Sequence, residues 1–254
     1  MFTYIGFDDT DTLDADYGTG KLARWFEKEL SNGYLFRGVV RQQLLVHEKI
    51  PYTSHNSAAC VVLDIPDLSG KEDIVEKATA HIERFSLEGS DPGLCVVYKN
   101  NPSIGRLIDF GLTCTREVVT QRDAMEAASH VHLSSHGGTS DGIIGAAAAV
   151  GLTAYGWSGR FIEFGRLRHF PEIVRVSELE RANITVVSLD RDSNVPAPED
   201  IVYTNGWLRP RLLGTKAVLC VVPMRNGVWK SLGEKRKKKE QDDHRPGTGA
   251  RHGR

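Results

Sequence analysis

Residues 2–12 have the sequence FTYIGFDDTDT, in which an apolar segment is followed at once by clustered acids. The apolar part, residues 2–7, predicts a β-strand, and Asp8, Asp9 and Asp11 come where the chain leaves it. Ligands commonly bind at such strand ends. Mg²⁺ prefers oxygen ligands and usually binds through one or two carboxylates plus substrate phosphates. The pattern therefore predicts that Asp8, Asp9 and Asp11 hold Mg²⁺ and act in catalysis.

Two other interpretations of the acids are an EF-hand and a purely structural turn. An EF-hand counted from Asp9 would have Leu13 at its fifth position and Asp14 where glycine is required, so a calcium loop of that type is excluded. An acidic turn held by side-chain to backbone hydrogen bonds stays open as a purely structural alternative. The functional interpretation is favoured because three adjacent carboxylates repel one another unless a cation or base offsets them.

Strand and helix patterns alternate beyond this segment, which predicts an α/β (α+β) fold with layers of sheet and helix. Strands are predicted at 2–7, 39–46, 58–65, 94–98, 184–189 and 217–222. Helices are predicted at 22–30, 72–85, 122–132 and 142–150, the last ending at Gly151. We expect a larger domain over residues 1–155, a smaller α+β subdomain over 156–230 and a disordered basic tail over 231–254.

The charge balance argues against a dedicated nucleic-acid binder. The 254 residues carry a formal net charge of −1, with a pI of about 6.8. The body therefore lacks the overall basic surface of such proteins, and any contact with a polyanion must be local. The obvious candidate is the run Lys235–Lys239 in the tail. This tail has a simpler interpretation as a solvated chain end.

Cysteine usage and hydropathy point to a cytoplasmic protein that contacts no membrane. The four cysteines are scattered without a C-x-x-C pair, which argues against a zinc ribbon and predicts core residues instead. The N-terminal segment lacks the features of a signal peptide. The longest apolar run, residues 142–152, is about half of the ~20 residues that a membrane span needs.

A glycine-containing loop, Gly18-Thr19-Gly20-Lys21, opens the first predicted helix. Its backbone N–H groups and the Lys21 ammonium are suited to an anion at a helix N-terminus. The loop is not a Walker A motif, because G-x-x-x-x-G-K-S/T fails both at Ala15 and at Leu22. We predict that Gly18, Gly20 and Lys21 contact ATP, although an ordinary helix start explains the pattern equally well.

A second glycine-rich loop, His136-Gly137-Gly138-Thr139-Ser140-Asp141, precedes the small-residue helix that begins at Gly142. Backbone amides and the helix dipole suit a phosphate here, so His136, Gly137, Gly138, Gly142 and Ile143 are predicted to bind ATP. Asp141 is an unfavourable neighbour for an anion and is expected to cap the helix or bind the metal.

Three histidines, His130, His132 and His136, lie two and four residues apart, a spacing that can indicate a metal site. A fourth ligand is not apparent in the neighbouring sequence. We therefore assign His136 to the phosphate loop and the other two to the end of the predicted helix.

Four blocks in this order resemble the archaeal isoleucine-tRNA agmatinylcytidine synthetase (TiaS) family, in its N-terminal kinase-like domain. They are residues 5–11 (IGFDDTD), 50–58 with Ile50-Pro51-Tyr52, Asn56 and Ala58, Asp91-Pro92-Gly93, and residues 142–151 with GIIG and AAVG. The blocks span residues 5–151. The region after about residue 156 is only faintly similar to the family's ferredoxin-like domain.

The resemblance implies an Mg²⁺- and ATP-dependent enzyme. In this family ATP phosphorylates the carbonyl oxygen of a cytosine, and an amine then displaces the phosphate. The resemblance implies that Asp8, Asp9, Thr10 and Asp11 handle Mg²⁺-ATP, that Thr19 is a phosphorylatable catalytic threonine, and that Gly142 and Ile143 belong to the nucleotide pocket. Phosphorylation converts an oxygen into a good leaving group, and the metal stabilises the charge of the transferring phosphoryl.

The chain also departs from the family. The family's Lys-Thr-Arg-Gly-Asn-Gly stretch is replaced by residues 53–57, TSHNS, without its bases, and Asp141 stands where an Arg often precedes the Gly-Ile pair. The C-terminal OB-fold and zinc ribbon have no counterpart in this sequence. ATP chemistry is therefore expected, with a small molecule or a nucleobase as the acceptor. A tRNA partner is less well supported, and the alternatives are a non-catalytic nucleotide-binding module and an RNA-binding protein.

Overall fold

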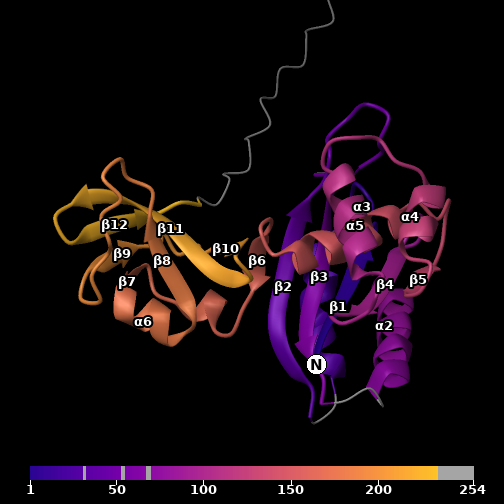
Figure 1. Ribbon diagram of the computed structural model, residues 1–254, viewed down its shortest axis with the longest axis horizontal. Helices are drawn as coiled ribbons and strands as arrows, with labels where there is room; N and C mark the ends of the chain where they lie inside the picture. Colours follow the sequence, from indigo (N-terminus) through magenta and orange to yellow (C-terminus); the bar gives the residue numbers. More distant parts are fainter. Residues whose placement is uncertain (31–32, 53–54, 67–69, 234–254) are drawn as a thin grey trace, which may run out of the picture.

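The computed structural model describes residues 1–30, 33–52, 55–66 and 70–233, and it confirms the mixed α/β fold class (Figure 1). β1 (Phe2–Asp8) lies between β3 (Ser57–Asp64) and β4 (Gly93–Tyr98), antiparallel to both. β2 (Leu35–Gln43) pairs with β3, and β5 (His132–Ser135) pairs with β4 at the edge. The acids that follow β1 thus leave an interior strand of the sheet.

The sheet continues into the C-terminal part of the chain through β6 (Arg160–Glu163), which pairs with both β2 and β10 (Arg211–Leu213). The strand order is β5-β4-β1-β3-β2-β6-β10-β11-β12-β9-β7, with β8 paired to β11. The remaining strands are β7 (Ile173–Arg175), β8 (Ile184–Ser188), β9 (Ile201–Tyr203), β11 (Lys216–Arg225) and β12 (Val228–Ser231). Helix α6 (Val176–Arg181) packs against β8.

Helices cover both faces of the N-terminal half of the sheet. One face carries α1 (Thr19–Trp25), the 3₁₀ helix η1 (Phe26–Glu29) and α2 (Lys71–Phe85). The other carries α3 (Ile104–Thr113), α4 (Gln121–Ala127) and α5 (Gly142–Tyr155). Side chains alternate between the faces of a strand, so Ile5 and Phe7 pack on the first face while Tyr4 packs on the second.

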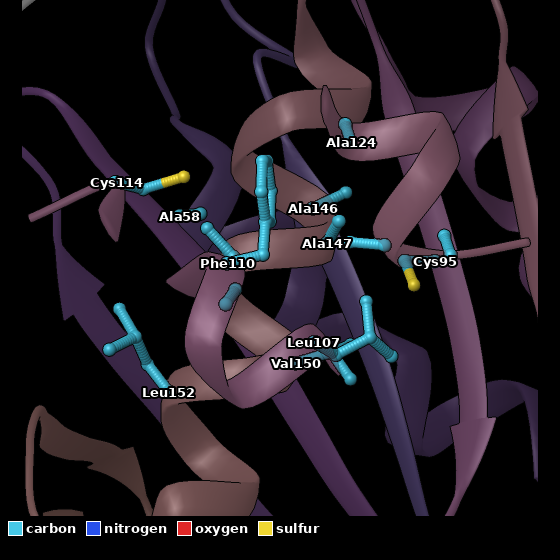
Figure 2. Close-up of a cluster of buried hydrophobic side chains, with 14 of the residues drawn as sticks. Ala58, Cys95, Leu107, Phe110, Cys114, Ala124, Ala146, Ala147, Val150 and Leu152 are labelled. Atoms are coloured by element: carbon cyan, nitrogen blue, oxygen red, sulfur yellow. The ribbon is translucent and has the colours of Figure 1, made fainter. Parts of the chain in front are cut away.

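Helix α5 lies unusually close to the sheet because its contact positions have no side chain. A Cβ on Gly6 would lie 2.1 Å from the carbonyl oxygen of Ala146, and one on Gly93 would lie 2.1 Å from the carbonyl carbon of Gly142. Figure 2 shows the small residues Ala146 and Ala147 packed among Leu107 and other members of this core. The small side chains bring the start of α5 directly against the end of β1.

Several predicted boundaries differ from the structure. The first helix starts at Thr19 instead of residue 22 and tightens to 3₁₀ at Phe26. The helix predicted at 122–132 ends at Ala127, so His132 lies in β5. α5 continues past Gly151 and ends before Gly156, whose φ of 76° is the left-handed conformation of a helix end. Residues 104–113 form α3, which was not predicted.

Gly151 is interior for a packing reason. A Cβ there would lie 1.8 Å from the carbonyl oxygen of Leu107 in α3, so the glycine allows the two helices to cross closely. A sequence pattern cannot separate this use of glycine from a helix stop. All four cysteines, Cys60, Cys95, Cys114 and Cys220, are buried and free, as predicted.

The C-terminal part has a hydrophobic cluster of its own, with Phe161, Leu179, Leu219 and Trp229 among its buried members. The division at residue 155/156 remains a prediction. Ser231 belongs to β12 and is buried, so ordered structure extends past residue 230, where the tail was expected to begin. Residues 234–254, including Lys235–Lys239, lie outside the described residues. Among the helices of the described residues, none has the length and apolar character to span a membrane.

Candidate active site

Asp8 is the last residue of β1 and points toward the first turn of α5. A Cβ on Gly145 would lie 1.6 Å from Oδ2 of Asp8, so the carboxylate occupies space that only a glycine leaves open. Burial, together with the adjacent charge of Asp9, raises the pKa of Asp8 to about 8. The Asp8 carboxyl therefore sits in a site that favours its neutral form unless a cation accompanies it.

Asp9 is the centre of a wider acidic cluster. Its backbone has a φ of 50°, in the left-handed region that aspartate and asparagine tolerate best among residues with a side chain. Burial, followed by the charges of Asp91, Asp11 and Asp141, raises the pKa of Asp9 to about 6. We call Asp8, Asp9, Asp11, Asp91 and Asp141 the acid cluster.

The acid cluster is not a preformed metal cage. Among the described residues, no three His, Cys, Asp or Glu side chains come together closely enough to hold a metal ion alone. Mg²⁺ does not require such a cage, because it commonly uses one or two carboxylates with substrate phosphates and water. The crowded, partly desolvated acids are the kind of donor set that a divalent cation would stabilise.

Asp11 and Thr19 form a hydrogen-bond network where α1 begins. The backbone N–H and the hydroxyl of Thr19 donate to Asp11 Oδ1 at 3.3 Å and 3.2 Å. Thr10 donates to Thr19 Oγ1 from its backbone N–H at 3.3 Å and from its hydroxyl at 3.1 Å. Both threonines are buried. The predicted catalytic residues Asp11 and Thr19 are therefore in direct contact, with Thr10 as their support.

A pocket of about 270 Å³ opens beside this network. One wall consists of Asp11 and the loop residues Gly18, Thr19, Gly20 and Lys21, so the pocket brings together residues that were predicted for the metal and for ATP. The other wall comes from β2, β3 and the segment before β3, through Arg41, His55 and Ser57–Ala59. Lys21 and Arg41 place positive charge on both walls, so the pocket is suited to an anionic group.

Sequence reasoning missed Arg41, His55 and Ser57. The replacement of the family's bases near residue 55 suggested that positive charge was absent here. The structure instead places Arg41 in this wall from the neighbouring strand, where its Nε donates to Ser57 Oγ at 2.8 Å. The pairing of β2 with β3 brings the residues together, and only that pairing could have signalled it. Thr53 and Ser54 lie outside the described residues.

The second glycine-rich loop is held by Asp91. Thr139 donates to Asp91 from its backbone N–H at 2.7 Å and from its hydroxyl at 2.6 Å. Gly138 has a φ of 56°, and a Cβ there would lie 1.2 Å from Oδ1 of Asp91. Asp141 accepts a hydrogen bond of 2.6 Å from Gln121 Nε2 and makes no side-chain cap on α5. Asp141 therefore occupies the N-cap position of α5 without the predicted side-chain cap, and its expected role at a metal remains a prediction.

His136 is occupied within the protein. Its Nδ1 lies 3.2 Å from Glu83 Oε1 in α2, and its Nε2 lies 2.8 Å from Ser134 Oγ, which also contacts His132. Neither His136 nor Gly137, Gly138, Gly142 or Ile143 lines the 270 Å³ pocket. The predicted ATP-binding residues thus fall into two groups. Asp9 links them, because its charge interacts with Asp11 in the pocket and with Asp91 and Asp141 beside the second loop.

Gly142 and Ile143 have a clear packing role. Ile143 is buried in the core beneath α5. A Cβ on Gly142 would lie 2.0 Å from the carbonyl oxygen of Asp91. The absence of a side chain at Gly142 is therefore explained by contact with the segment before β4, whatever else its backbone binds.

No family model and no curated protein matches this sequence. Among solved structures, the tRNA–ATP complex of TiaS aligns with a TM-score of 0.51 and 23% identity, over 59% of this chain and 36% of that one. Apo TiaS, an isoleucine-tRNA agmatidine synthetase, gives 0.48 and 22%, over 59% and 35%. A tRNA fluorescent labeling enzyme gives 0.48 and 23%, over 59% and 36%. The chain thus spans about a third of those proteins, and the predicted resemblance to TiaS is confirmed for the fold.

Proposed function

We propose that this chain is an ATP-dependent enzyme that uses Mg²⁺ to phosphorylate a carbonyl oxygen of an acceptor, in preparation for attack by an amine. The observation that carries the proposal is the position of Asp11. It belongs to the acid cluster and also lines the pocket that holds Lys21 and Arg41. Asp11 therefore joins the carboxylates that could hold a cation to the pocket whose Lys21 and Arg41 could bind phosphates. Phosphoryl transfer needs this arrangement.

The residues have distinct proposed roles. Asp8 and Asp9 would hold Mg²⁺ together with phosphate oxygens, since their charges are crowded and partly desolvated. Bound Mg²⁺ would supply neutralisation of the charge on the transferring phosphoryl. Lys21 and Arg41 would bind the remaining phosphate oxygens from the two walls of the pocket. The Gly18 and Gly20 backbone would line the same phosphate path.

Thr19 is proposed as a phosphoryl acceptor within the protein. Its hydroxyl donates to the Asp11 carboxylate at 3.2 Å, so Asp11 is placed to orient the hydroxyl and to take its proton as Oγ1 attacks. The new bond joins Thr19 Oγ1 to the γ-phosphorus of ATP, and the bond from that phosphorus to the bridging oxygen breaks, which releases ADP. The support is this contact together with the family resemblance.

The acceptor is proposed to be a cytosine-like base, and tRNA is its favoured carrier. In the proposed reaction the carbonyl oxygen attacks the phosphorus held on Thr19, and the bond from that phosphorus to Thr19 Oγ1 breaks, which frees the threonine. An amine such as agmatine then forms the new C–N bond as the C–O bond breaks and inorganic phosphate leaves with its electron pair, while the amine loses a proton. The shared fold with the tRNA–ATP complex of TiaS supports this direction over a small-molecule acceptor.

Phosphorus NMR of ATP tests the proposal directly. The full chain is incubated with ATP, Mg²⁺ and agmatine, with or without an isoleucine tRNA transcript. We expect ADP and phosphate to appear only when the transcript is present, with mass added to one cytidine. AMP and pyrophosphate as the products would contradict the kinase step. ATP binding without turnover, whichever acceptor is added, would mean that the chain is a nucleotide-binding module and not an enzyme.

A pair of variants locates the activity in the site. Asp9→Asn should remove turnover, because one metal ligand loses its charge. Asp109→Asn makes the same chemical change on the exposed surface of α3 and should leave turnover intact. Equal activity of the two variants would place the chemistry elsewhere.

A further inference from the structure

Four arginines from distant parts of the sequence gather beside the proposed active site. Arg24 lies in α1, Arg41 in β2, Arg168 in the 3₁₀ helix η3 (Leu167–His169), and Arg209 in the segment before β10. Strand pairing brings two of them together, because Arg41 in β2 lies opposite Arg160 in β6, and Arg160 lies opposite Arg211, two residues after Arg209. Arg24 and Arg168 both contact Glu163, and the charges of Arg168, Arg24 and Arg41 act on Arg209. We call these four residues the arginine cluster.

Glu163 in β6 contacts two members of the arginine cluster. Its Oε2 lies 3.0 Å from Arg168 Nε and 3.8 Å from Arg24 Nη1. Burial and the nearby charge of Glu163 raise the pKa of Glu27. The like charges of the arginine cluster repel one another, which favours a bound anion.

Arg209 is the most constrained member. Its guanidinium carbon lies 3.5 Å from the centroid of the Trp207 ring, and its Nη1 donates to the carbonyl oxygen of Leu208 at 2.6 Å. Stacking on an aromatic ring leaves the edge of a guanidinium available for bidentate hydrogen bonds. Burial, with the neighbouring arginines, lowers the pKa of Arg209 to about 10, so it is still protonated at neutral pH.

The arginine cluster is continuous with the 270 Å³ pocket. Arg41 is a member of both, because it lines the pocket and also acts on Arg209. Arg24 and the pocket residue Lys21 lie three positions apart on α1, which places them on neighbouring parts of one helix surface. The side chains of Arg24 and Arg168 are 22% and 34% exposed, so both can be reached from solvent.

We propose that Arg24, Arg41, Arg168 and Arg209 form a phosphate-binding site that holds the backbone of an RNA acceptor next to the pocket. The cluster extends from β2 past β6 toward β10, so it spans the junction between the two halves of the sheet. Several guanidinium groups spread along such a path match successive phosphodiesters better than one compact phosphate. The identity of the acceptor rests on the proposed function, whereas the phosphate chemistry rests on the cluster.

This site changes where RNA affinity is expected. The sequence pointed to Lys235–Lys239 as the only obvious basic segment, because charge counted along the chain shows no other run. Folding brings four separated arginines together on the body. The same chemistry has a second possible source in the phosphates of ATP, and the experiment separates the two.

Fluorescence anisotropy with the full chain tests the site. The probes are a labelled single-stranded oligoribonucleotide and, in a parallel titration, a fluorescent ATP analogue with Mg²⁺. Arg168→Gln should weaken RNA binding by about tenfold and lower the salt slope by about one unit, because one charge-assisted phosphate contact is lost. Arg168→Lys should recover most of the slope. ATP binding should stay the same.

Arg106→Gln in α3 is the matched control, because it removes the same charge from the opposite face of the sheet. Arg168 is the main test position because its side chain is exposed enough for the variant to fold, and Arg209→Gln adds the constrained member. Loss of ATP binding with unchanged RNA binding would assign the cluster to the nucleotide and overturn the RNA assignment. The proposed phosphate site would be overturned if Arg168→Gln and Arg209→Gln both left RNA affinity unchanged. It would also be overturned if the control Arg106→Gln reduced RNA affinity equally.

These outcomes are separate from those of the proposed function. If the chain never turns over ATP but Arg168→Gln still lowers the salt slope of RNA binding, the arginine cluster stands and the enzyme proposal fails. If turnover occurs and RNA binding is insensitive to the four arginines, the enzyme proposal stands and the phosphate site fails.

Discussion

The acid cluster and the arginine cluster are both groups of like charge, yet the protein holds them in different ways. The central acids are largely desolvated, and the pKa values of Asp8 and Asp9 are raised to about 8 and about 6. Arg24 and Arg168 keep contact with solvent and with Glu163, and Arg209 stacks on the ring of Trp207. The acids are therefore destabilising until a cation binds, whereas the arginines stay charged and accessible for an anion.

The two clusters also differ in how the chain builds them. Asp8, Asp9 and Asp11 come from one short segment after a strand, so their proximity is a local property. The arginines come from α1, β2, η3 and the segment before β10, and only the sheet order brings those elements together. Their side-by-side position suggests one site in which a cation with ATP occupies the first region and a polyanion occupies the second.

The largest expected effect is the loss of activity in Asp9→Asn. Turnover of ATP should fall by about 100-fold or more, because electrostatic stabilisation of the transferring phosphoryl is lost. The fold should persist, since asparagine tolerates the left-handed backbone that Asp9 adopts. Initial rates by phosphorus NMR and thermal unfolding of the same sample provide the two measurements. A variant with wild-type turnover would remove the acid cluster from the mechanism.

The acids come from one segment and the arginines from four, and this difference explains which features could be predicted from the sequence. The strand that becomes β1, the acids after it and the loop at Gly18–Lys21 are contiguous, and the structure places the loop and Asp11 in one pocket. Arg41 reaches that pocket through strand pairing, which no local pattern reports.

Glycine was the ambiguous signal. A phosphate cradle and a close helix-to-sheet contact both require small residues. The glycines at the start of α5 therefore predict nucleotide binding even where their only role is packing. The structure shows the packing use at Gly142, Gly145 and Gly151. A Gly142→Val variant would therefore disrupt the contact with the segment before β4, and it does not isolate an effect on nucleotide.

A smaller effect is expected when the space beside Asp8 is filled. In Gly145→Ala the added Cβ would lie 1.6 Å from Oδ2 of Asp8, so the carboxylate must move. We expect turnover to drop about tenfold and unfolding free energy to fall by roughly 1–3 kcal/mol from overpacking.

Gly105→Ala in α3 is the matched control, because a Cβ there meets nothing within 4 Å. This variant should keep full activity and gain about 0.4–1 kcal/mol of stability, since alanine restricts the unfolded chain. Thermal unfolding and ATP turnover are measured for both proteins. If both alanine variants behaved alike, α5 would have no role in positioning the acid cluster.

The pH dependence of stability should separate the two clusters. A carboxyl whose pKa is raised on folding contributes stability below its unfolded pKa and loses it as pH rises through the folded value. In EDTA, the stability difference between Asp8→Asn and the wild type should therefore grow from pH 5 to pH 8, by at most about 1.4 kcal/mol per pH unit. Arg168→Gln should show no such trend, because it leaves the Asp8 carboxyl in its buried site. Denaturant unfolding at several pH values measures both, and parallel curves would contradict the burial of Asp8.

The smallest expected effect comes from Glu163→Gln, which removes a carboxylate that contacts two members of the arginine cluster. Its ion pairs with Arg24 and Arg168 are partly exposed, so their loss should cost only about 0.2–1 kcal/mol of stability. The cluster would then carry one more net positive charge, and RNA affinity at low salt should rise by about threefold with a steeper salt slope.

The direction of the change in RNA affinity is informative, because removal of a carboxylate that merely supported the fold would lower RNA binding. Anisotropy titrations of wild type and Glu163→Gln over a salt series, with Asp109→Asn on α3 as the matched loss of one negative charge, measure the effect. Weaker RNA binding in Glu163→Gln alone would mean that the ion pairs hold the arginines in place, and an equal gain in both variants would reduce the effect to net charge.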